Sequence, residues 1–205
     1  MADTQTSANP IDVIADPGPL GLAGFAATTL VLSVTNAGLV NANVAFAVLP
    51  LALFYGGLGQ LLAGMWEFRK GNTFGATAFS TYGAFWLAFA FYSWFFAGKI
   101  PTADAGQATG MFLLVFVIVT GYLSVAAMRV SVAILAVFIA LTLTFLFLTI
   151  GAFATSDAMN HIGGWIGIVT ALLAFYASSA GVTNATWKRT VLPVFPLAPT
   201  TAIAR

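Results

Sequence analysis

The chain has 205 residues, of which 60% are hydrophobic and only 6% are charged, with a formal net charge of +1. A soluble domain typically has about 25% charged residues, so this composition excludes an ordinary water-soluble globule, and the near-neutral charge excludes an electrostatic surface for nucleic acid. With no cysteine and a single histidine, His161, the sequence also excludes disulfides, thiolate catalysis and multi-histidine metal sites, and we expect no metal or cofactor.

Five uncharged runs predict the membrane-spanning helices, namely 17–66, 71–98, 105–128, 130–156 and 158–187. A spanning helix needs roughly 20 apolar residues, so each of the last four runs holds one helix. The first run is long enough for two, and the polar, turn-prone stretch 36–43 divides it. We therefore predict an all-α bundle of six transmembrane helices, at 20–38, 44–66, 75–97, 109–128, 131–152 and 160–182.

The positions of Lys and Arg predict the orientation of this bundle, because short cytoplasmic loops carry an excess of these residues. With a cytoplasmic N-terminus, only Lys99 falls outside, whereas the inside segments carry Arg69, Lys70, Arg129, Lys188, Arg189 and Arg205. We therefore expect an integral, multi-pass protein of the cell membrane (plasma or inner), surrounded by lipid, with both termini in the cytoplasm. It would consist of an N-terminal tail, a six-helix domain and a C-terminal tail, over 1–17, 18–187 and 188–205.

The proline-containing residues 191–205 are expected to be disordered. Elsewhere, no charged residue lies near the middle of a predicted helix. Glu67 and Arg129 stand at cytoplasmic helix ends, from which we expect their side chains to reach the interface. An intramembrane enzyme needs embedded nucleophiles, metal ligands or haem ligands, so we do not expect an enzyme.

Uncharged polar and aromatic residues share helix faces when about 100° is allowed per residue. The faces consist of Phe25, Thr29, Leu32 and Asn36 in the first helix, with Thr28 beside them, of Tyr82, Trp86, Phe89 and Ser93 in the third, and of Ile134, Leu141, Phe145 and Leu148 in the fifth. Such faces serve either as packing surfaces or as the lining of a pore, and their hydroxyl groups also form interhelical hydrogen bonds.

Two helix starts are predicted on the cytoplasmic side. Asp16, Pro17 and Pro19 introduce the first helix, and Asn72 or Thr73 is placed to cap the third. The free amides at a helix start carry partial positive charge and can hold a small anion. Plain capping and anion binding both fit these residues.

The same strings carry a resemblance to a known family. The segment 16–22, Asp-Pro-Gly-Pro-Leu-Gly-Leu, resembles the Asn-Pro-Ala-Pro-Leu-Gly-Leu signature of the acetate uptake transporter family, which includes bacterial succinate–acetate permeases and fungal acetate and ammonia-export proteins. The similarity continues through a seventeen-residue string at 63–79 and through shorter islands at 54–57, 82–86, 161–167 and 189–193. It covers residues 16–193.

The resemblance implies six transmembrane helices per protomer, a homohexamer, and a pathway in each protomer for acetate and related small monocarboxylates, with succinate in some members. It also implies a narrow hydrophobic constriction formed by Phe25, Tyr82 and Leu141, which lie on the three faces described above. We expect further pathway residues at Thr28, Thr29, Asn36, Asn72, Thr73 and Trp86. The signature motif itself corresponds to Asp16, Pro17, Pro19, Leu20 and Gly21.

The chain departs from the signature at Asp16 and Gly18, where the family has Asn and Ala. An aspartate at this mouth would repel a carboxylate unless it caps the helix or is protonated. A carboxylate also meets a large desolvation cost at an apolar constriction with no fixed cation, so we expect proton-linked acetate uptake that weakens as the external pH rises.

Two alternatives to proton-linked uptake remain open, a gated anion channel and a channel for small neutral solutes such as urea or ammonia. His161, near the outer end of the sixth helix, is either a pH sensor or a structural hydrogen-bonding group.

Overall fold

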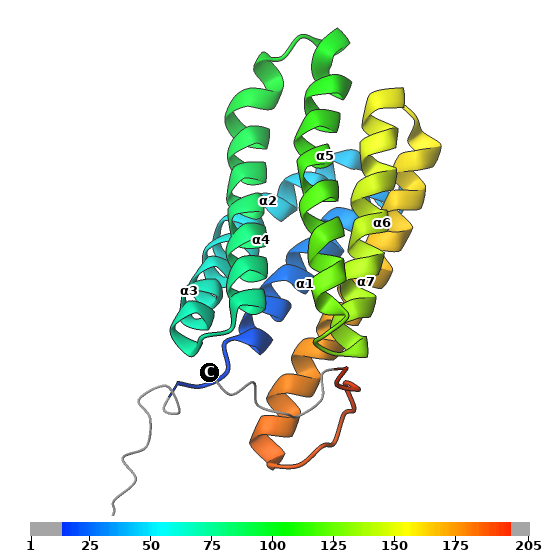
Figure 1. Cartoon of the computed structure of the whole chain (residues 1–205). Helices are drawn as coiled ribbons and strands as arrows, with labels where there is room; N and C mark the ends of the chain where they lie inside the picture. The colour runs from blue at the N-terminus through cyan, green and yellow to red at the C-terminus, as the bar shows by residue number, and fades with distance from the viewer. Residues whose placement is uncertain (1–13, 198–205) are drawn as a thin grey trace, which may run out of the picture.

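The computed structural model describes residues 14–197, which form a bundle of helices (Figure 1). Residues 1–13 and 198–205 lie outside the described part, and with them most of the expected N-terminal tail and the end of the C-terminal tail. Within 14–197, six helical segments are long and apolar enough to cross a membrane. The prediction of an all-α bundle with six membrane-spanning helices is therefore confirmed.

Four of these segments are single α-helices, namely α1 (Gly18–Asn36), α5 (Thr102–Ala127), α6 (Val132–Ala154) and α7 (Asp157–Trp187). The second segment is divided into η2 (Ala42–Ala47), α2 (Val48–Leu53), the π-helical turn η3 (Phe54–Gly59) and α3 (Gln60–Lys70). The third continues α4 (Thr73–Phe91) into the π-helical η4 (Tyr92–Phe96) and the short η5 (Ala97–Lys99).

The fourth spanning helix begins earlier than the sequence predicts. We expected it from residue 109, whereas α5 begins at Thr102 and leaves only 100–101 as a connection. Asp104 lies in the first turn of α5, where the helix dipole favours a negative side chain. This charged residue therefore marks a helix start, and treating it as part of a loop was wrong.

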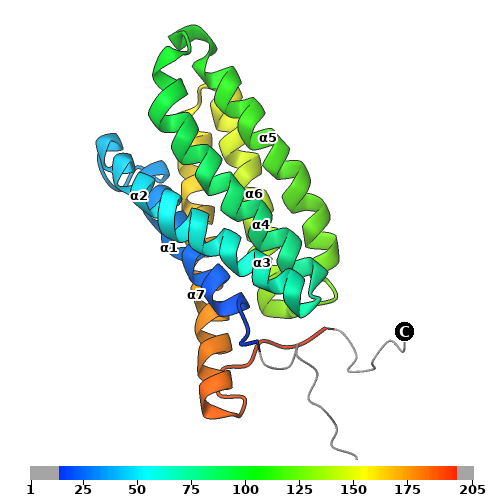
Figure 2. The same ribbon diagram turned by 90° about the vertical axis from the view of Figure 1, so that its left-hand side faces the viewer.

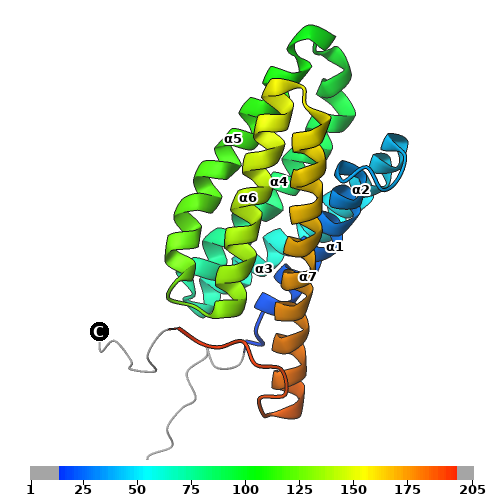
Figure 3. The same ribbon diagram turned by 90° about the vertical axis from the view of Figure 1, so that its right-hand side faces the viewer.

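The last helix is also longer than predicted. It was expected over 160–182, but α7 runs over Asp157–Trp187, and its start is capped by the side chain of Ser156. Figure 3 shows α7 lying between α1 and α6, against which it packs. A β-carbon on Gly164 would meet the backbone of Ala37, so the absence of a side chain lets α7 and the end of α1 approach closely.

A tight turn joins α3 to α4, and these two helices lie side by side (Figure 2). Gly71 adopts the left-handed conformation, with φ of 78°, and ends α3. The backbone N–H of Asn72 donates to the carbonyl of Glu67 at 3.0 Å, and the Asn72 side chain accepts a hydrogen bond from the N–H of Gly75 at 3.1 Å. Gly71 therefore ends α3 and Asn72 caps α4, where the sequence predicted Asn72 or Thr73 as the cap.

The first and last described residues lie at the same end of the bundle (Figure 1). The connection between α3 and α4 and the connection between α5 and α6 are also at this end. Five of the described Lys and Arg residues lie in or beside these segments, namely Arg69, Lys70, Arg129, Lys188 and Arg189, and Lys99 lies at the opposite end. The structure thus gathers the positive charge at one end, as the sequence-based orientation requires.

The segment 191–197 is held by hydrogen bonds, so the expectation of disorder was wrong for these residues. The side chain of Asn184, on α7, accepts a hydrogen bond of 2.7 Å from the N–H of Val191. Further along, the N–H of Leu197 donates to the carbonyl of Val130 at 3.1 Å. The side chain of Asn184 and the carbonyl of Val130 thus form hydrogen bonds with the backbone of this segment, which has no regular secondary structure of its own.

Candidate transport pathway

Two cavities follow one another along the inside of the bundle. The first, of about 220 Å³, lies at the end where α1 begins, and the second, of about 680 Å³, lies toward the other end. Only Phe25 and Leu141, among the described residues, line both cavities. These two side chains therefore stand where the cavities meet.

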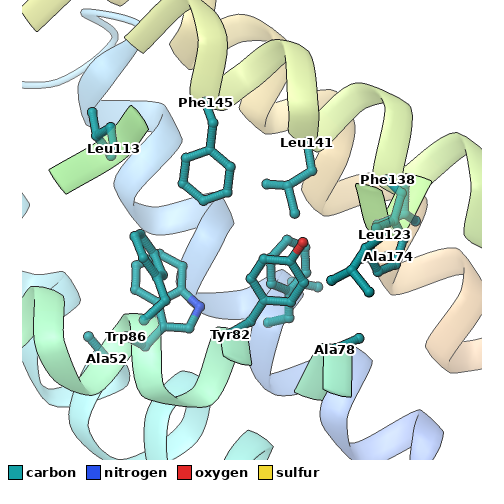
Figure 4. Close-up of a cluster of buried hydrophobic side chains, with 14 of the residues drawn as sticks. Ala52, Ala78, Tyr82, Trp86, Leu113, Leu123, Phe138, Leu141, Phe145 and Ala174 are labelled. Carbon is teal, nitrogen blue, oxygen red and sulfur yellow. The ribbon is translucent and has the colours of Figure 1, made fainter. Parts of the chain in front are cut away.

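The three predicted constriction residues come together at this meeting point. Phe25, Tyr82 and Leu141 are 5%, 3% and 3% exposed, and they come from α1, α4 and α6. The rings of Phe25 and Tyr82 have centroids 5.7 Å apart and planes inclined at 53°. Figure 4 shows the side chains of Tyr82 and Leu141 pointing toward one another. Their role as a constriction remains a prediction.

A threonine on α5 holds the Tyr82 hydroxyl. The hydroxyl donates to Oγ1 of Thr120 at 3.0 Å, and Thr120 is completely buried. The Tyr82 oxygen can still accept a hydrogen bond, but its proton is used inside the protein. The sequence did not predict a role for Thr120, because a single hydroxyl on an apolar helix does not indicate which residue of another helix it will contact.

Two buried donors without a partner line the second cavity next to the constriction. The Trp86 side chain is 2% exposed and Thr29 is 5% exposed, yet neither Trp86 Nε1 nor Thr29 Oγ1 has a hydrogen-bond partner in the described part of the chain. Buried polar groups normally have partners, so an unpaired indole N–H and hydroxyl are available to a ligand in this cavity. Asn36 and His161 line the same cavity.

Other predicted pathway residues lie elsewhere. Thr28 lines neither cavity, since its hydroxyl donates to the carbonyl of Gly24 at 2.9 Å and its side chain packs against Gly56. Thr73 is exposed at the start of α4 and lines neither cavity, whereas Asn72 lines the first. The structure therefore favours a packing role for Thr28.

Some residues of the signature motif line a cavity and others do not. Asp16 and Pro19 line the first cavity, and Pro17, Leu20 and Gly21 do not. Oδ1 of Asp16 accepts hydrogen bonds from the N–H of Gly18 at 3.1 Å and from Nζ of Lys70 at 2.9 Å. Asp16 thus binds the first N–H of α1 and is paired with a cation, which answers the objection that it would repel a carboxylate.

Glu67 corrects an expectation about the charged residues. Its side chain does not reach the interface, because it is only 2% exposed and lines the first cavity. The side chain of Asn72 and the Glu67 carboxyl both lie against Gly75, and Oε2 of Glu67 has no hydrogen-bond partner within residues 14–197. Sequence reasoning missed this burial because it depends on Gly18 and Gly75, which leave room for the carboxyl between two helix starts.

A bundle of six membrane-spanning helices with two internal cavities that meet at a buried apolar contact is the architecture of a multi-pass membrane transport protein. The family model of the GPR1/FUN34/yaaH family matches residues 2–199. The chain belongs to this family, and it is a multi-pass integral protein of the cell membrane.

Named relatives and a solved structure share this similarity. The chain is 37% identical over 183 residues to the succinate-acetate/proton symporter SatP of Escherichia coli, covering 88% of this chain and 95% of that protein. It is 40% identical over 203 residues to acetate permease A of Emericella nidulans, covering 91% and 68% of the two chains. The structure titled "Structure of the bacterial acetate channel SatP" matches with a TM-score of 0.83 and 36% identity, over 88% of this chain and 99% of that one.

Proposed function

We propose that the protein carries acetate and related small carboxylates, succinate among them, across the cell membrane together with a proton. One observation carries the proposal most directly. Among the described residues, Phe25 and Leu141 alone line both cavities, and Tyr82 packs against Phe25. The relatives named above are acetate and succinate transport proteins by their names, which gives the substrate class.

The apolar contact supports proton linkage. A carboxylate ion that passes Phe25, Tyr82 and Leu141 loses its hydration, and none of these side chains carries a charge to replace it. A proton that travels with the substrate removes the charge at this step. Acetic acid is mostly ionised at neutral pH, so uptake weakens as the external pH rises.

The donors of the second cavity support a waiting position for the substrate. Trp86 Nε1 and Thr29 Oγ1 are buried, unpaired and next to residues of the proposed constriction. Hydrogen bonds to a charged acceptor contribute about 1.5–3 kcal/mol each, so two such donors can hold a carboxylate without a fixed cation. The substrate would then lose its water in two steps.

Orientation and assembly belong to the same proposal. We place the described end that carries Arg69, Lys70 and Arg129 in the cytoplasm, because positive residues accumulate there. Both tails, over 1–17 and 188–205, would then be cytoplasmic. The resemblance to the acetate uptake transporters supports a homohexamer with one pathway in each protomer, which native mass spectrometry in detergent tests directly.

Labelled-acetate uptake into proteoliposomes, with and without an inward proton gradient, tests the function. Proton-linked transport predicts uptake that the gradient accelerates and that falls between about pH 5 and 8. Equal uptake with and without the gradient would favour a gated anion channel. The similar solved structure is that of a protein described as an acetate channel, SatP. Uptake of ammonia or urea without uptake of acetate would favour a channel for neutral solutes. This alternative is supported by the similarity to ammonia transport outward protein 2 of Saccharomyces cerevisiae.

A further inference from the structure

A buried carboxyl group lies at the mouth of the first cavity, apart from the proposed constriction. Glu67 is 2% exposed, lines this cavity and leaves Oε2 without a hydrogen-bond partner. Acidic side chains are almost never fully buried unless they are paired, because the charged form loses its hydration. The unpaired oxygen therefore points to a ligand that supplies a proton or a donor.

The carboxyl lies between two helix starts. A β-carbon on Gly75, in the first turn of α4, would lie 2.8 Å from Cδ of Glu67, and one on Gly18, the first residue of α1, would lie 3.6 Å from its Oε1. Helix starts favour an anion through their free amides. The protein thus places its own carboxyl where the sequence predicts that a substrate carboxylate is held.

The described charged groups that line this cavity beside Glu67 are one carboxylate, Asp16, and one ammonium group, Lys70. These two groups pair with each other, since Nζ of Lys70 lies 2.9 Å from Oδ1 of Asp16. From α4 the cavity receives Tyr82 as its titratable side chain, and the described residues that line it from α6 and α7 are apolar or glycine. The neutral amide of Asn72 lies beside Glu67, since a β-carbon on Gly75 would meet both side chains.

We propose that Glu67 is the proton-exchange group of the cytoplasmic mouth and binds a small carboxylate through a proton shared between the two carboxyl groups, an inference that rests on the proposed acetate transport. When the neutral acid arrives from the constriction, its O–H bond breaks and an O–H bond forms at Oε2 of Glu67. The products are a substrate carboxylate and a neutral Glu67, so charge and atoms balance. The carboxylate leaves, and Glu67 then releases its proton to water at the mouth.

This exchange makes the affinity of the mouth depend on the charge of Glu67. A neutral Glu67 donates a hydrogen bond to acetate, whereas a charged Glu67 repels it. For two carboxylates about 4 Å apart near a protein surface, the difference corresponds to at least about a tenfold change in affinity. Binding acetate to the charged form also requires the uptake of about one proton per acetate.

The inference is tested by measuring how many protons the purified full-length protein takes up when it binds acetate. The measurement is made in weakly buffered detergent solution. Wild-type protein should take up a proton as acetate binds, and infrared difference spectra should gain the band of a protonated carboxyl group. Glu67→Gln should bind acetate with pH-independent affinity and without either signal. Asp104→Asn, which removes an exposed carboxyl of α5, should behave like wild type.

The outcomes separate this inference from the proposed function. A wild-type protein that carries labelled acetate in proteoliposomes but binds it with no proton uptake overturns the role of Glu67 and leaves the transport function standing. Proton uptake that persists in a folded Glu67→Gln protein, judged by its gel-filtration profile, also overturns it. A wild-type protein that neither carries nor binds acetate overturns both. Because the first measurement needs no variant, the inference stays testable if Glu67→Gln does not fold.

Discussion

The hydroxyl of Tyr82 donates a 3.0 Å hydrogen bond to Thr120, which joins α4 to α5 directly behind the meeting point of the two cavities. Thr120→Val removes the acceptor and leaves a buried hydroxyl unpaired, which costs about 1–3 kcal/mol of unfolding free energy. We expect a lower melting temperature and a Tyr82 ring that is less firmly oriented. Thermal unfolding in detergent measures the first effect.

A double-mutant cycle provides the control for this hydrogen bond. Tyr82→Phe removes the donor, so adding Thr120→Val to it should cost less than Thr120→Val costs in wild type. Additive effects of the two substitutions would show that the hydrogen bond contributes nothing to stability.

Leu141→Ala and Phe25→Ala should widen the contact between the cavities. Each substitution removes side-chain volume at a position that lines both of them, so larger acids such as lactate or succinate should pass faster relative to acetate. Competition and direct flux measurements in proteoliposomes give the ratio. Leu146→Ala is the matched control, because Leu146 is an exposed residue of α6, the helix that carries Leu141. This variant should keep the wild-type ratio. If both Phe25 and Leu141 variants also keep it, these residues do not form the constriction.

Trp86→Phe and Thr29→Val test the donors of the second cavity. Neither group has a hydrogen-bond partner in the structure, so their removal should leave thermal stability nearly unchanged. The loss of one hydrogen bond to a carboxylate should raise the KM for acetate about 10- to 100-fold. A large loss of stability with an unchanged KM would instead assign these residues to packing.

His161→Ala tests the predicted pH sensor at the second cavity. A pH sensor at this position should set part of the pH dependence of flux through the second cavity. We expect a changed pH profile at similar maximal flux. A variant with the wild-type profile would leave His161 as a structural group beside Gly38.

Asn184→Ala tests the ordered segment 191–197. The Asn184 side chain accepts from two backbone N–H groups and donates to the carbonyl of Leu192 at 2.8 Å. Its removal should make this segment sensitive to limited proteolysis while the bundle persists. Thr183→Ala, the neighbouring substitution, should keep the protease resistance of wild type, and equal resistance of both variants would contradict the role of Asn184.

The sequence predicted the helices well because each spanning segment needs a long apolar run, and charged residues interrupt such runs visibly. It also selected Phe25, Tyr82 and Leu141, which the fold brings to one place, through helix faces and a resemblance. Asp104 shows where this approach fails, since a charge at a helix start reads like a loop. The burial of Glu67 was out of reach, because it depends on Gly18 and Gly75 facing it from other helices.

Within residues 14–197, the linings of the two cavities share Phe25 and Leu141 alone, and this separates properties that a single binding pocket would combine. In the proposed pathway, a substitution at a lining residue other than Phe25, Tyr82 and Leu141 should change substrate affinity in one cavity and leave the other cavity and the proposed constriction unchanged. Uptake and release can therefore diverge independently as such a protein evolves. The same separation offers three targets for engineering, namely each of the two cavities for substrate affinity and the shared residues for the size of the transported acid.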